Sequence, residues 1–447
     1  MPRSPKPPTD TGGGAPRPPL LARGWQALLL AVYAMVLRLA TPLYLLRLWR
    51  RGSAEPGYRF RLMERLGFYP GRQPMPGAVW LHAVSLGEAR AALPLVEALR
   101  RAHPEIRLLF THGTATGRAA GRKLMQDGDG QVWMPYDTPG ATRRFLRHFQ
   151  PGVGVLMETE LWPAMMREAE RLDVPVLLAN ARLSERSAAK GQRMASLLHP
   201  AAARLALVLA QTVDDARRLR EAGAPKVMVS GNLKFDMTPP PRLTAQGLQW
   251  RQDLRRPVVL AASTREGEEG PLLAAWAALP VPRPLLLLVP RHPQRFQEVE
   301  ALARMQGLTL HCRTEWDDQP PADAAMADLW VGDSMGEMPL YYACADVALL
   351  GGSFAPLGGQ NLIEAAACGC PVVMGPHTFN FAQASKQALQ AGAAQRVDNI
   401  QAGVKAAVQL ASDPDRNAWV HRALGFANAH RGAAALIAQH VLRLARR

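Results

Sequence analysis

Short apolar runs alternate with helix-like stretches along most of this chain, and this rhythm limits the fold more than any other feature. In the first half the runs are Ala78–His82, Arg107–Thr111, Val153–Met157, Pro175–Ala179, Ala206–Ala210 and Val227–Val229. In the second half they are Pro257–Ala261, Leu285–Val289, Leu308–Cys312, Leu329–Val331, Val347–Leu350 and Val372–Met374. Strands and helices in alternation form parallel sheets with helices on both faces. The sequence therefore predicts an α/β fold.

The length and one Pro-rich stretch predict two domains. A chain of 447 residues is too long for a single core. Residues 236–246 are rich in proline and separate the two series of strands. We expect two doubly wound, Rossmann-like domains at 53–236 and 247–447, facing a cleft where ligands bind at the carboxyl ends of the strands. The last helices, from about Pro414, are expected to pack on either domain.

The N-terminal segment is basic and apolar. The first 72 residues contain 12 Lys and Arg against 3 Asp and Glu, so they carry +9 of the net charge of +16. Residues 1–19 are rich in Pro and Gly and predict a disordered tail. Residues 20–52 predict a membrane-associated helix, because the long apolar run Trp25–Leu48 is interrupted by few residues, among them Gln26, Arg38, Pro42 and Arg47, and is followed by arginines.

Two interpretations of this helix stay open. It either spans the membrane at a tilt or lies in the interface while Arg38 reaches the headgroups. In both cases the arginines that follow it favour a body on the cytoplasmic side. A buried core helix is the plainer alternative, and the flanking arginines disfavour it.

Metal chemistry is not predicted. Cys368 and Cys370 form a C-x-C without paired ligands, which indicates structural thiols in a reducing compartment. The D-x-D at Asp127 and Asp129 lies outside any predicted strand end, so we interpret it as a loop. A P-loop motif is also missing, which disfavours that class of nucleotide hydrolase.

In the first half, acidic residues follow two predicted strands. Glu88 follows Gly87 at a strand-to-helix turn, and Glu158 and Glu160 come directly after another strand. A carboxylate in the first turn of a helix often does no more than complement the helix dipole. An acid at the carboxyl edge of a sheet, in apolar surroundings, is also a candidate general base.

In the second half, three strand ends carry residues suited to a nucleotide-linked ligand. Glycines allow close approach of a ligand to the backbone, arginine pairs with phosphate, and a carboxylate such as Glu364 can bind a ribose diol. Each feature alone is common in α/β loops, and Glu364 alone reads more simply as a helix-start acid. The candidate donor-binding residues are Arg291, His292, Gly332, Met335, Gly352, Ser353, Asn361 and Glu364.

Seven motifs resemble one known family, in the same order along the chain. They are HAVSLGE, METELWP, GNLKFD, STREGEE, PRHPQRF, GDSMGEM and GGQNLIEA…PVVMGPHTFNF, and the chain is similar to the Kdo transferases of lipopolysaccharide synthesis over about residues 25–430. The resemblance implies a GT-B fold and transfer of 3-deoxy-D-manno-octulosonic acid (Kdo) from CMP-Kdo to the tetraacylated lipid A precursor, lipid IVA. It implies inversion at the sugar, the cytoplasmic face of the bacterial inner membrane as the location, and no cofactor.

The resemblance also implies residue roles. Glu88 corresponds to the general base, Glu160 or Glu158 to a further acid needed for activity, and the second-half residues to the donor site. The domain at 53–236 then binds the acceptor and that at 247–447 binds CMP-Kdo. The sequence departs from the family at Arg265 and Gln360, where histidine is expected. These departures put details of donor contact in doubt rather than the reaction.

Two other classes compete with this interpretation. One is another GT-B sugar-nucleotide transferase or an epimerase of similar fold. The other is a basic nucleic-acid-binding protein, which predicts positive charge over the whole body. Because the excess charge is concentrated beside the apolar segment, we expect membrane lipids as partners and no nucleic acid.

Overall fold

The computed structural model describes residues 20–446. The chain divides into two compact units, unit 1 with Met1–Ser230 and Ala435–Arg447, and unit 2 with Gly231–Ala434. The predicted tail at residues 1–19 lies outside the described residues. The Pro-rich stretch at 236–246 belongs to unit 2 and includes the start of a helix, α9 (Pro241–Asp253), with proline in its first turn. The linker prediction was therefore wrong from residue 241 on.

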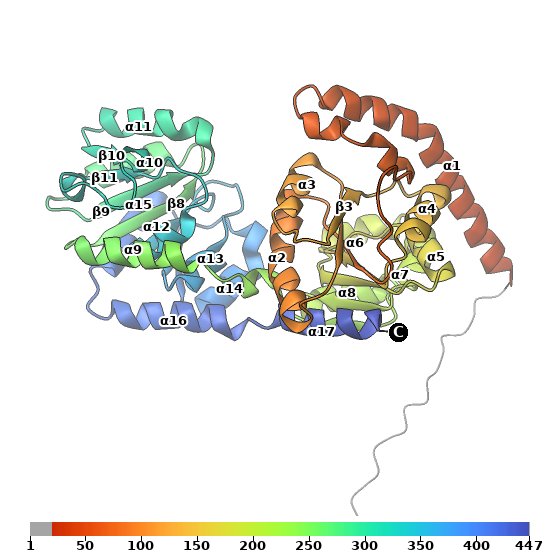
Figure 1. Ribbon diagram of the computed structural model, residues 1–447. Helices are drawn as coiled ribbons and strands as arrows, with labels where there is room; N and C mark the ends of the chain where they lie inside the picture. Colours follow the sequence, from red (N-terminus) through yellow and green to blue (C-terminus); the bar gives the residue numbers. More distant parts are fainter. Residues whose placement is uncertain (1–19, 447) are drawn as a thin grey trace, which may run out of the picture. The chain divides into compact units, whose positions relative to one another are not determined.

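Unit 1 contains a parallel sheet of seven strands in the order β3-β2-β1-β4-β5-β6-β7 (Figure 1). The chain starts in the middle of the sheet at β1, moves outward through β2 and β3, and then continues on the other side of β1 with β4. The boundary between β1 and β4 is thus the point where the winding reverses. The strands are β1 (Val79–His82), β2 (Leu108–His112), β3 (Gly130–Trp133), β4 (Val153–Met157), β5 (Val176–Ala181), β6 (Leu207–Ala210) and β7 (Val227–Val229).

Helices connect these strands, and several begin with a side-chain cap. Ser85, Thr114 and Thr212 each accept a hydrogen bond from a backbone N–H of the first turn. The helical elements of unit 1 are α1 (Leu20–Arg51), η1 (Pro56–Arg59), η2 (Leu62–Leu66), α2 (Leu86–Ala102), α3 (Ala115–Arg122), α4 (Pro139–Phe149), α5 (Pro163–Arg171), α6 (Glu185–Gln192), α7 (Ala195–Ala202) and α8 (Val213–Glu221), with α17 (Ala433–Ala445) joining from the C-terminus.

Unit 2 has the same type of architecture, with a second parallel sheet of seven strands in the order β10-β11-β9-β8-β12-β13-β14. Its winding reverses between β8 and β12. The strands are β8 (Val258–Thr264), β9 (Leu285–Pro290), β10 (Leu310–Cys312), β11 (Leu329–Val331), β12 (Val347–Leu350), β13 (Val372–Met374) and β14 (Ala394–Arg396). The helical elements are η3 (Leu233–Asp236), α9, α10 (Glu269–Ala277), η4 (Pro293–Arg295), α11 (Phe296–Met305), η5 (Arg313–Glu315), η6 (Ala324–Met326), α12 (Met338–Cys344), α13 (Leu362–Ala367), η7 (Phe379–Phe381), α14 (Ala382–Gln390), α15 (Ile400–Ala411) and α16 (Arg416–Ala429).

The central strands are buried on both faces, which explains their continuous apolar sequences. All six residues of β9 are buried, for example. The two strands that the sequence did not predict, β3 and β14, lie at the edges of their sheets. β3 begins with Gly130 and Gln131, so its apolar part is short, and two of the three residues of β14 are exposed.

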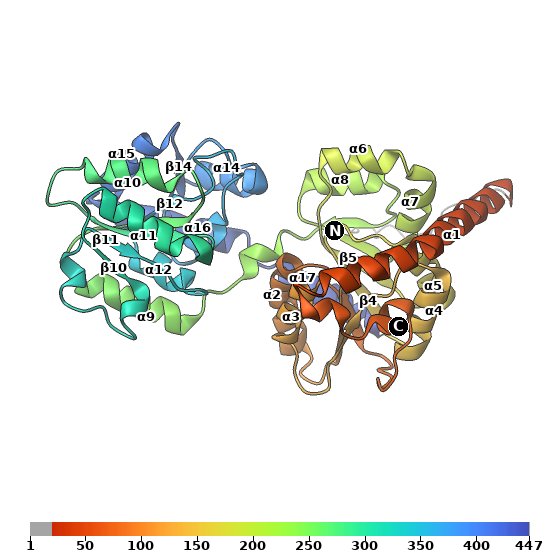
Figure 2. The same ribbon diagram turned by 90° about the horizontal axis from the view of Figure 1, so that it is seen from above.

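Helix α1 runs along the outside of unit 1, next to α5 (Figures 1 and 2). Within the described part of the chain, only Ala27–Arg51 is long and apolar enough to cross a membrane, with mean hydropathy 1.8. Leu30 and Ala34 are buried against unit 1, and the Tyr33 hydroxyl donates a hydrogen bond of 3.0 Å to Asp137. Most of the other large apolar side chains of α1 are exposed, with Leu39 at 72% and Leu43 at 70%.

Candidate active site

Glu88 lies in the first turn of α2, directly after β1. The sequence Ser85-Leu86-Gly87-Glu88 forms a variant of the capping box, in which the Glu88 carboxylate accepts the Val84 N–H instead of the N–H of the N-cap Ser85. The Ser85 hydroxyl accepts the Glu88 N–H at 3.3 Å and donates to Oε1 at 2.8 Å, while the Val84 N–H donates to Oε2 at 2.8 Å. A carboxylate has about four acceptor sites, so each oxygen keeps room for one more donor. The cap therefore fixes the side chain and leaves it able to accept a proton.

Glu158 and Glu160 follow β4, the strand that pairs with β1 on the other side of the winding reversal. Glu158 has a left-handed backbone with φ of 58°, and its N–H donates to Ala179 O at 2.9 Å. A positive φ is unusual for a residue with a side chain and marks a constrained turn. This turn leads to Glu160, which is half-buried.

The three acids form one electrostatic group. Burial, the charge of Glu88 and, to a smaller extent, that of Glu158 raise the pKa of Glu160 to about 7. The Trp162 indole opposes this shift and lowers the pKa. Like charges raise the pKa of an acid only when they are near it. The structure therefore brings together the first-half acids that the sequence singled out.

Glu160 should make stability depend on pH. The pKa of Glu160 is higher in the folded state than the ordinary value of a glutamate. At pH values between these two pKa values, the folded state therefore binds more protons than the unfolded state does. Its contribution to stability is complete at low pH and is lost as the pH rises through about 7. We expect Glu160→Gln to raise the midpoint of thermal unfolding relative to wild type at pH 8.5, and less so at pH 6. An equal effect at both pH values would contradict this assignment.

Two buried histidines support the same edge of the sheet without titrating. The His82 Nδ1 lies 2.9 Å from Thr111 Oγ1, and the His112 Nδ1 lies 2.7 Å from Ala83 O. Burial lowers the pKa of His82 to about 3 and that of His112 to about 4, so both rings stay neutral. The predicted strand Arg107–Thr111 is observed as β2, which ends with Thr111 and His112.

In unit 2, a loop that contains Gly352 follows β12 at the winding reversal. Glu268, which follows β8, accepts four backbone hydrogen bonds that hold this loop. Oε2 accepts Gly352 N at 2.7 Å and Arg265 N at 3.0 Å, and Oε1 accepts Phe354 N at 3.1 Å and Ala355 N at 3.2 Å. Glu268 is 4% exposed, so the ends of β8 and β12 are joined by one buried carboxylate. Sequence reasoning missed this role, although the acidic run after Arg265 was a signal.

Gly352 also borders both positions where the sequence departs from the family pattern. Its φ is 70°, a conformation that favours glycine. A methyl group added here would lie 3.4 Å from Gln360 Nε2 and 3.7 Å from Arg265 Cγ. Gly352 O also accepts Gly359 N at 2.8 Å. The two departures therefore lie next to each other at one loop.

The remaining second-half candidates follow the neighbouring strands. Arg291 and His292 are exposed after β9, and the Arg291 N–H donates to Thr264 O at 2.9 Å. Gly332 follows β11, and a methyl group there would lie 2.7 Å from Val289 Cγ2. Met335 is 62% exposed. These residues lie on successive strand ends of one sheet, as the sequence pattern predicts.

Three candidates have partners within unit 2. Ser353 is fully buried; its hydroxyl donates to Leu350 O and accepts Gly375 N at 2.8 Å, which suits a residue that positions the loop. Asn361 caps α13 by accepting Ile363 N at 3.2 Å. Glu364 lines a small pocket with, among others, Lys234, Pro240, Pro339, Ile363 and Cys368.

No group of three or more His, Cys, Asp or Glu residues in the described part of the chain is arranged to hold a metal. The D-x-D motif has structural partners at its second acid. The Asp129 carboxylate pairs with Arg100 and accepts Leu108 N at 2.8 Å and Gln126 N at 2.9 Å.

Comparison with known proteins points to one family. Residues 60–237 match the family described as 3-deoxy-D-manno-octulosonic-acid transferase (kdotransferase). The chain is 46% identical over 90% of its length to a 3-deoxy-D-manno-octulosonic acid transferase of Bordetella pertussis, covering 96% of that protein. It is 34% identical over 84% of its length to the transferase of the same description from Haemophilus influenzae, covering 89% of that protein.

Solved structures agree on the fold. The UDP-GlcNAc 2-epimerase of Neisseria meningitidis matches 82% of this chain and 100% of its own, with TM-score 0.54 and 16% identity. HepE from Anabaena, solved with UDP, matches 82% of this chain and 99% of its own, with TM-score 0.53 and 13% identity. With the two parallel sheets, these matches confirm the predicted GT-B-type fold of two Rossmann-like domains.

Proposed function

Because the chain belongs to the family of 3-deoxy-D-manno-octulosonic acid (Kdo) transferases, which are glycosyltransferases, we propose that it transfers Kdo from CMP-Kdo to lipid IVA with inversion of the sugar. The observation that best supports this reaction is the capped Glu88 at the winding reversal of unit 1, next to Glu160. A fixed carboxylate with free acceptor sites suits a general base.

In the proposed reaction an acceptor hydroxyl attacks the anomeric carbon of Kdo. The oxygen–carbon bond forms as the bond from that carbon to the phosphate of CMP breaks, and the hydroxyl proton moves to Glu88. CMP leaves as a phosphate monoester and needs little protonation. Glu160 holds its own proton near neutral pH, so it limits the negative charge beside Glu88.

The donor half of the reaction is proposed for unit 2. Gly332, Gly352 and Gly359 are buried and add no side chain where they follow neighbouring strands, and Arg291 provides an exposed cation after β9. Glu268 and Ser353 hold the Gly352 loop in shape, so we assign them a positioning role. Asn361 and Glu364 are assigned to the nucleoside part of the donor, as the family resemblance implies.

A donor screen on the purified chain tests the function. We expect Kdo transfer to lipid IVA from CMP-Kdo, and no transfer or epimerisation with UDP-sugars. Turnover of a UDP-sugar in place of CMP-Kdo would assign the chain to another GT-B activity. Because UDP-GlcNAc epimerases share the fold, the screen should include UDP-GlcNAc without an acceptor.

The proposed location is the cytoplasmic face of the bacterial inner membrane, with α1 lying on the surface rather than spanning it. A spanning helix would carry Tyr33 into the hydrocarbon region, whereas Tyr33 donates to Asp137 in the body of unit 1. Asp137 is buried and also accepts the N–H groups of Ala164 and Met165 at the start of α5. Burial raises the pKa of Asp137 to about 6. The exposed apolar side of α1 is then free to enter the lipid interface.

Charges on the apolar side of α1 should weaken membrane binding. Each large apolar side chain contributes about 1.5–3 kcal/mol when buried. We therefore expect the double variant Leu39→Asp, Leu43→Asp to bind anionic vesicles at least roughly tenfold more weakly than wild type does, as measured by co-sedimentation. Met305→Asp, Met326→Asp is the matched control, because both methionines are exposed in unit 2. Equal binding of the two double variants would contradict the proposal.

A further inference from the structure

Arg65 is a buried cation that has no ionic partner among the described residues. It lies in η2 and is 4% exposed. Its Nη2 donates to Gly113 O at 3.0 Å, its guanidinium lies 4.1 Å from the centre of the Trp133 ring, and its Nε has no hydrogen-bond partner among the described residues. A buried charge is costly unless it is paired and hydrogen-bonded. Arg65 therefore has unused capacity for an anion.

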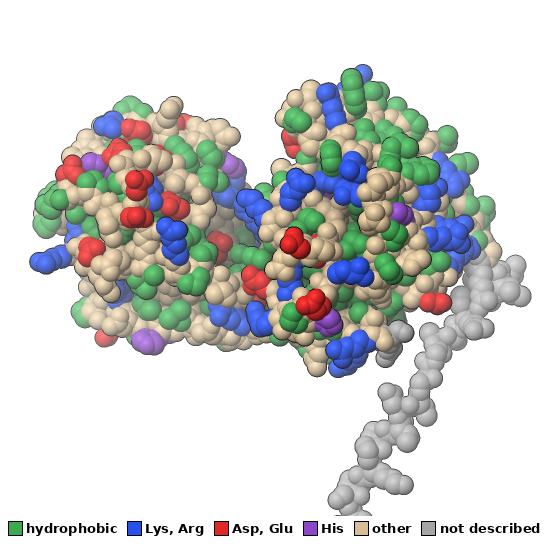
Figure 3. All heavy atoms as spheres, in the orientation of Figure 1, with side chains coloured by type: hydrophobic (Ala, Val, Ile, Leu, Met, Phe, Trp, Pro, Cys, Tyr) green, Lys and Arg blue, Asp and Glu red, His purple; other side chains and the backbone are tan. Residues whose placement is uncertain are grey.

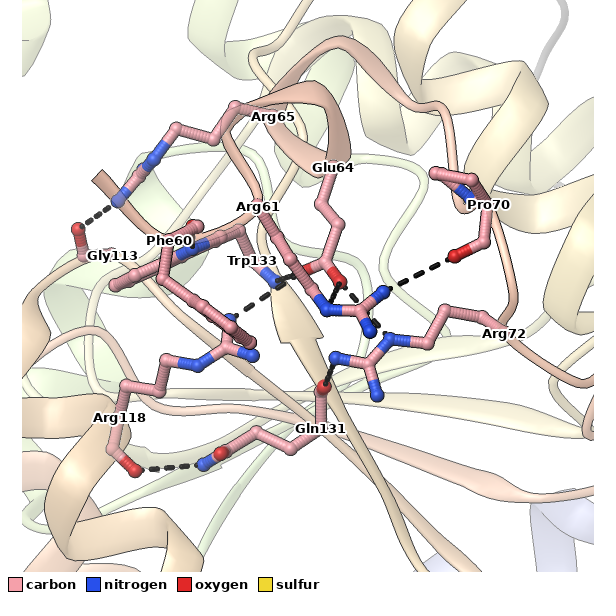
Figure 4. A network of polar contacts seen from close by, with 10 residues as sticks. All are labelled: Phe60, Arg61, Glu64, Arg65, Pro70, Arg72, Gly113, Arg118, Gln131 and Trp133. Carbon is pink, nitrogen blue, oxygen red and sulfur yellow. Dashed lines mark hydrogen bonds and ion pairs between the residues drawn. The ribbon is translucent and has the colours of Figure 1, made fainter. Parts of the chain in front are cut away.

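Its neighbours add positive charge rather than balance it. Arg61, Arg72 and Arg118 surround the single carboxylate of Glu64, at 4.0, 3.0 and 3.4 Å (Figure 4). Glu64 is 1% exposed and also accepts Trp133 N at 2.9 Å. We call Arg61, Arg65, Arg72 and Arg118 the arginine cluster. One carboxylate cannot neutralise four guanidinium groups.

Burial and mutual repulsion both disfavour the positive charges of the arginine cluster. Arg118 lies over the same Trp133 ring as Arg65, at 4.7 Å from its centre. Burial lowers the pKa of both guanidinium groups, and the charge of Arg118 lowers the pKa of Arg65 further. Arginine nevertheless stays protonated in proteins. Figure 3 shows Lys and Arg side chains gathered on one face of unit 1.

The cluster also lies between the membrane helix and the proposed base. On one side, Arg59 in η1 donates to Trp49 O of α1 at 2.9 Å, and Tyr58 stacks on Trp133. On the other side, Gly113 N donates to Val84 O at 3.2 Å, and Val84 N donates to Glu88. A lipid whose acyl chains lie beside α1 and whose sugar reaches Glu88 would pass this cluster.

We propose that Arg65 and Arg118 bind a phosphate group of the acceptor glycolipid. Guanidinium groups match phosphate oxygens with paired, charge-assisted hydrogen bonds. The phosphate would supply the negative charge that the cluster lacks and would place the sugar hydroxyl at Glu88. Arg72 is committed to Glu64 and Gln131 O, so it holds the cluster in shape. This inference rests on the proposed function, because lipid IVA is a phosphorylated glucosamine disaccharide lipid.

The test compares two acceptors on the purified full-length chain in neutral detergent micelles. One is the doubly phosphorylated tetraacyl disaccharide, and the other is the same lipid with one phosphate removed, tested as each of its two monophosphorylated forms. The variants are Arg65→Gln and Arg118→Gln. Arg107→Gln is the control, because Arg107 lies directly before β2 and its exposed side chain donates to Pro76 O.

Wild type is expected to use one monophosphorylated form with kcat/KM lowered roughly 10- to 100-fold, the range of charge-assisted hydrogen bonds. Each cluster variant should lose a similar factor on the doubly phosphorylated lipid and little on that monophosphorylated form. The control should match wild type on all acceptors. The KM for CMP-Kdo should stay unchanged in every variant, which shows that the protein is folded.

Three outcomes would overturn the inference. In the first, the variants lose the same factor on every acceptor, so that the cluster only supports the fold. In the second, wild type does not distinguish the acceptors. In the third, the KM for CMP-Kdo rises in both cluster variants but not in Arg107→Gln, which would assign the cluster to the phosphate of the donor. If Arg65→Gln does not fold, the kcat/KM values of Arg118→Gln on the two acceptors decide between these outcomes. Failure of wild type to transfer Kdo to any acceptor would instead contradict the proposed function.

Discussion

Replacing Glu88 with glutamine is expected to lower turnover by roughly 10²- to 10⁴-fold, the usual contribution of a general base. Glutamine cannot take the proton, yet it can keep the cap. Its carbonyl oxygen can accept Val84 N–H, and its amide can donate to the Ser85 hydroxyl, which both donates and accepts. The loss should therefore fall on kcat rather than on folding. The KM for CMP-Kdo should change little, because the proposed donor residues belong to unit 2.

Two further variants make this expectation specific. Glu97→Gln, on an exposed position of the same helix, is the matched control and should keep wild-type turnover. Glu88→Ala removes the cap as well, so it should also cost about 0.5–2 kcal/mol of stability. If Glu88→Gln keeps more than about a tenth of wild-type turnover, the loss is smaller than removal of a general base causes. That result would show that another group accepts the proton.

Replacing Glu268 with alanine should have the largest effect on unit 2. The substitution leaves four backbone N–H groups without their acceptor, at about 1–3 kcal/mol for each one that water cannot reach. We expect stability to fall by about 3 kcal/mol or more, measured by urea unfolding. The Gly352 loop would lose its tie to β8, so the KM for CMP-Kdo should rise more than kcat falls.

The neighbouring acid provides the control for Glu268. Glu266→Ala removes the same charge two residues earlier, from an exposed side chain, and should leave stability within about 0.5 kcal/mol of wild type. Glu268→Gln should be intermediate, because its carbonyl oxygen can still accept two of the four N–H groups. If Glu268→Ala and Glu266→Ala are equally stable, the positioning role proposed for Glu268 is contradicted.

The sequence predicts the central strands and the acid positions well, for a physical reason. Buried parallel strands need continuous apolar runs, and β4, β11, β12 and β13 begin and end where those runs do. Polar side chains that follow parallel strands must lie at one edge of the sheet. The sequence therefore singled out Glu88 and Glu160 as candidates. Their mutual repulsion could be recognised only in the structure.

What the sequence could not predict depends on contacts between distant residues. Glu64 and Arg118 are 54 positions apart, and Glu268 reaches Gly352 across 84 positions. The edge strand β14 lacks an apolar run because two of its three residues are exposed, and β3 has a short apolar run that begins only at Val132. Whether α1 spans or lies flat was open from composition, and the bond from Tyr33 to Asp137 is what favours the flat orientation.

The configuration of the new glycosidic bond tests the central claim most directly. A base that activates the acceptor hydroxyl for a single displacement inverts the anomeric centre of Kdo, because attack and departure occur on opposite faces. The measurement is the NMR anomeric assignment of the lipid product that the purified chain makes from CMP-Kdo and lipid IVA. We predict a product inverted relative to CMP-Kdo. A retained configuration would contradict the account, because it would require a covalent intermediate or a front-face route in which Glu88 is not the base.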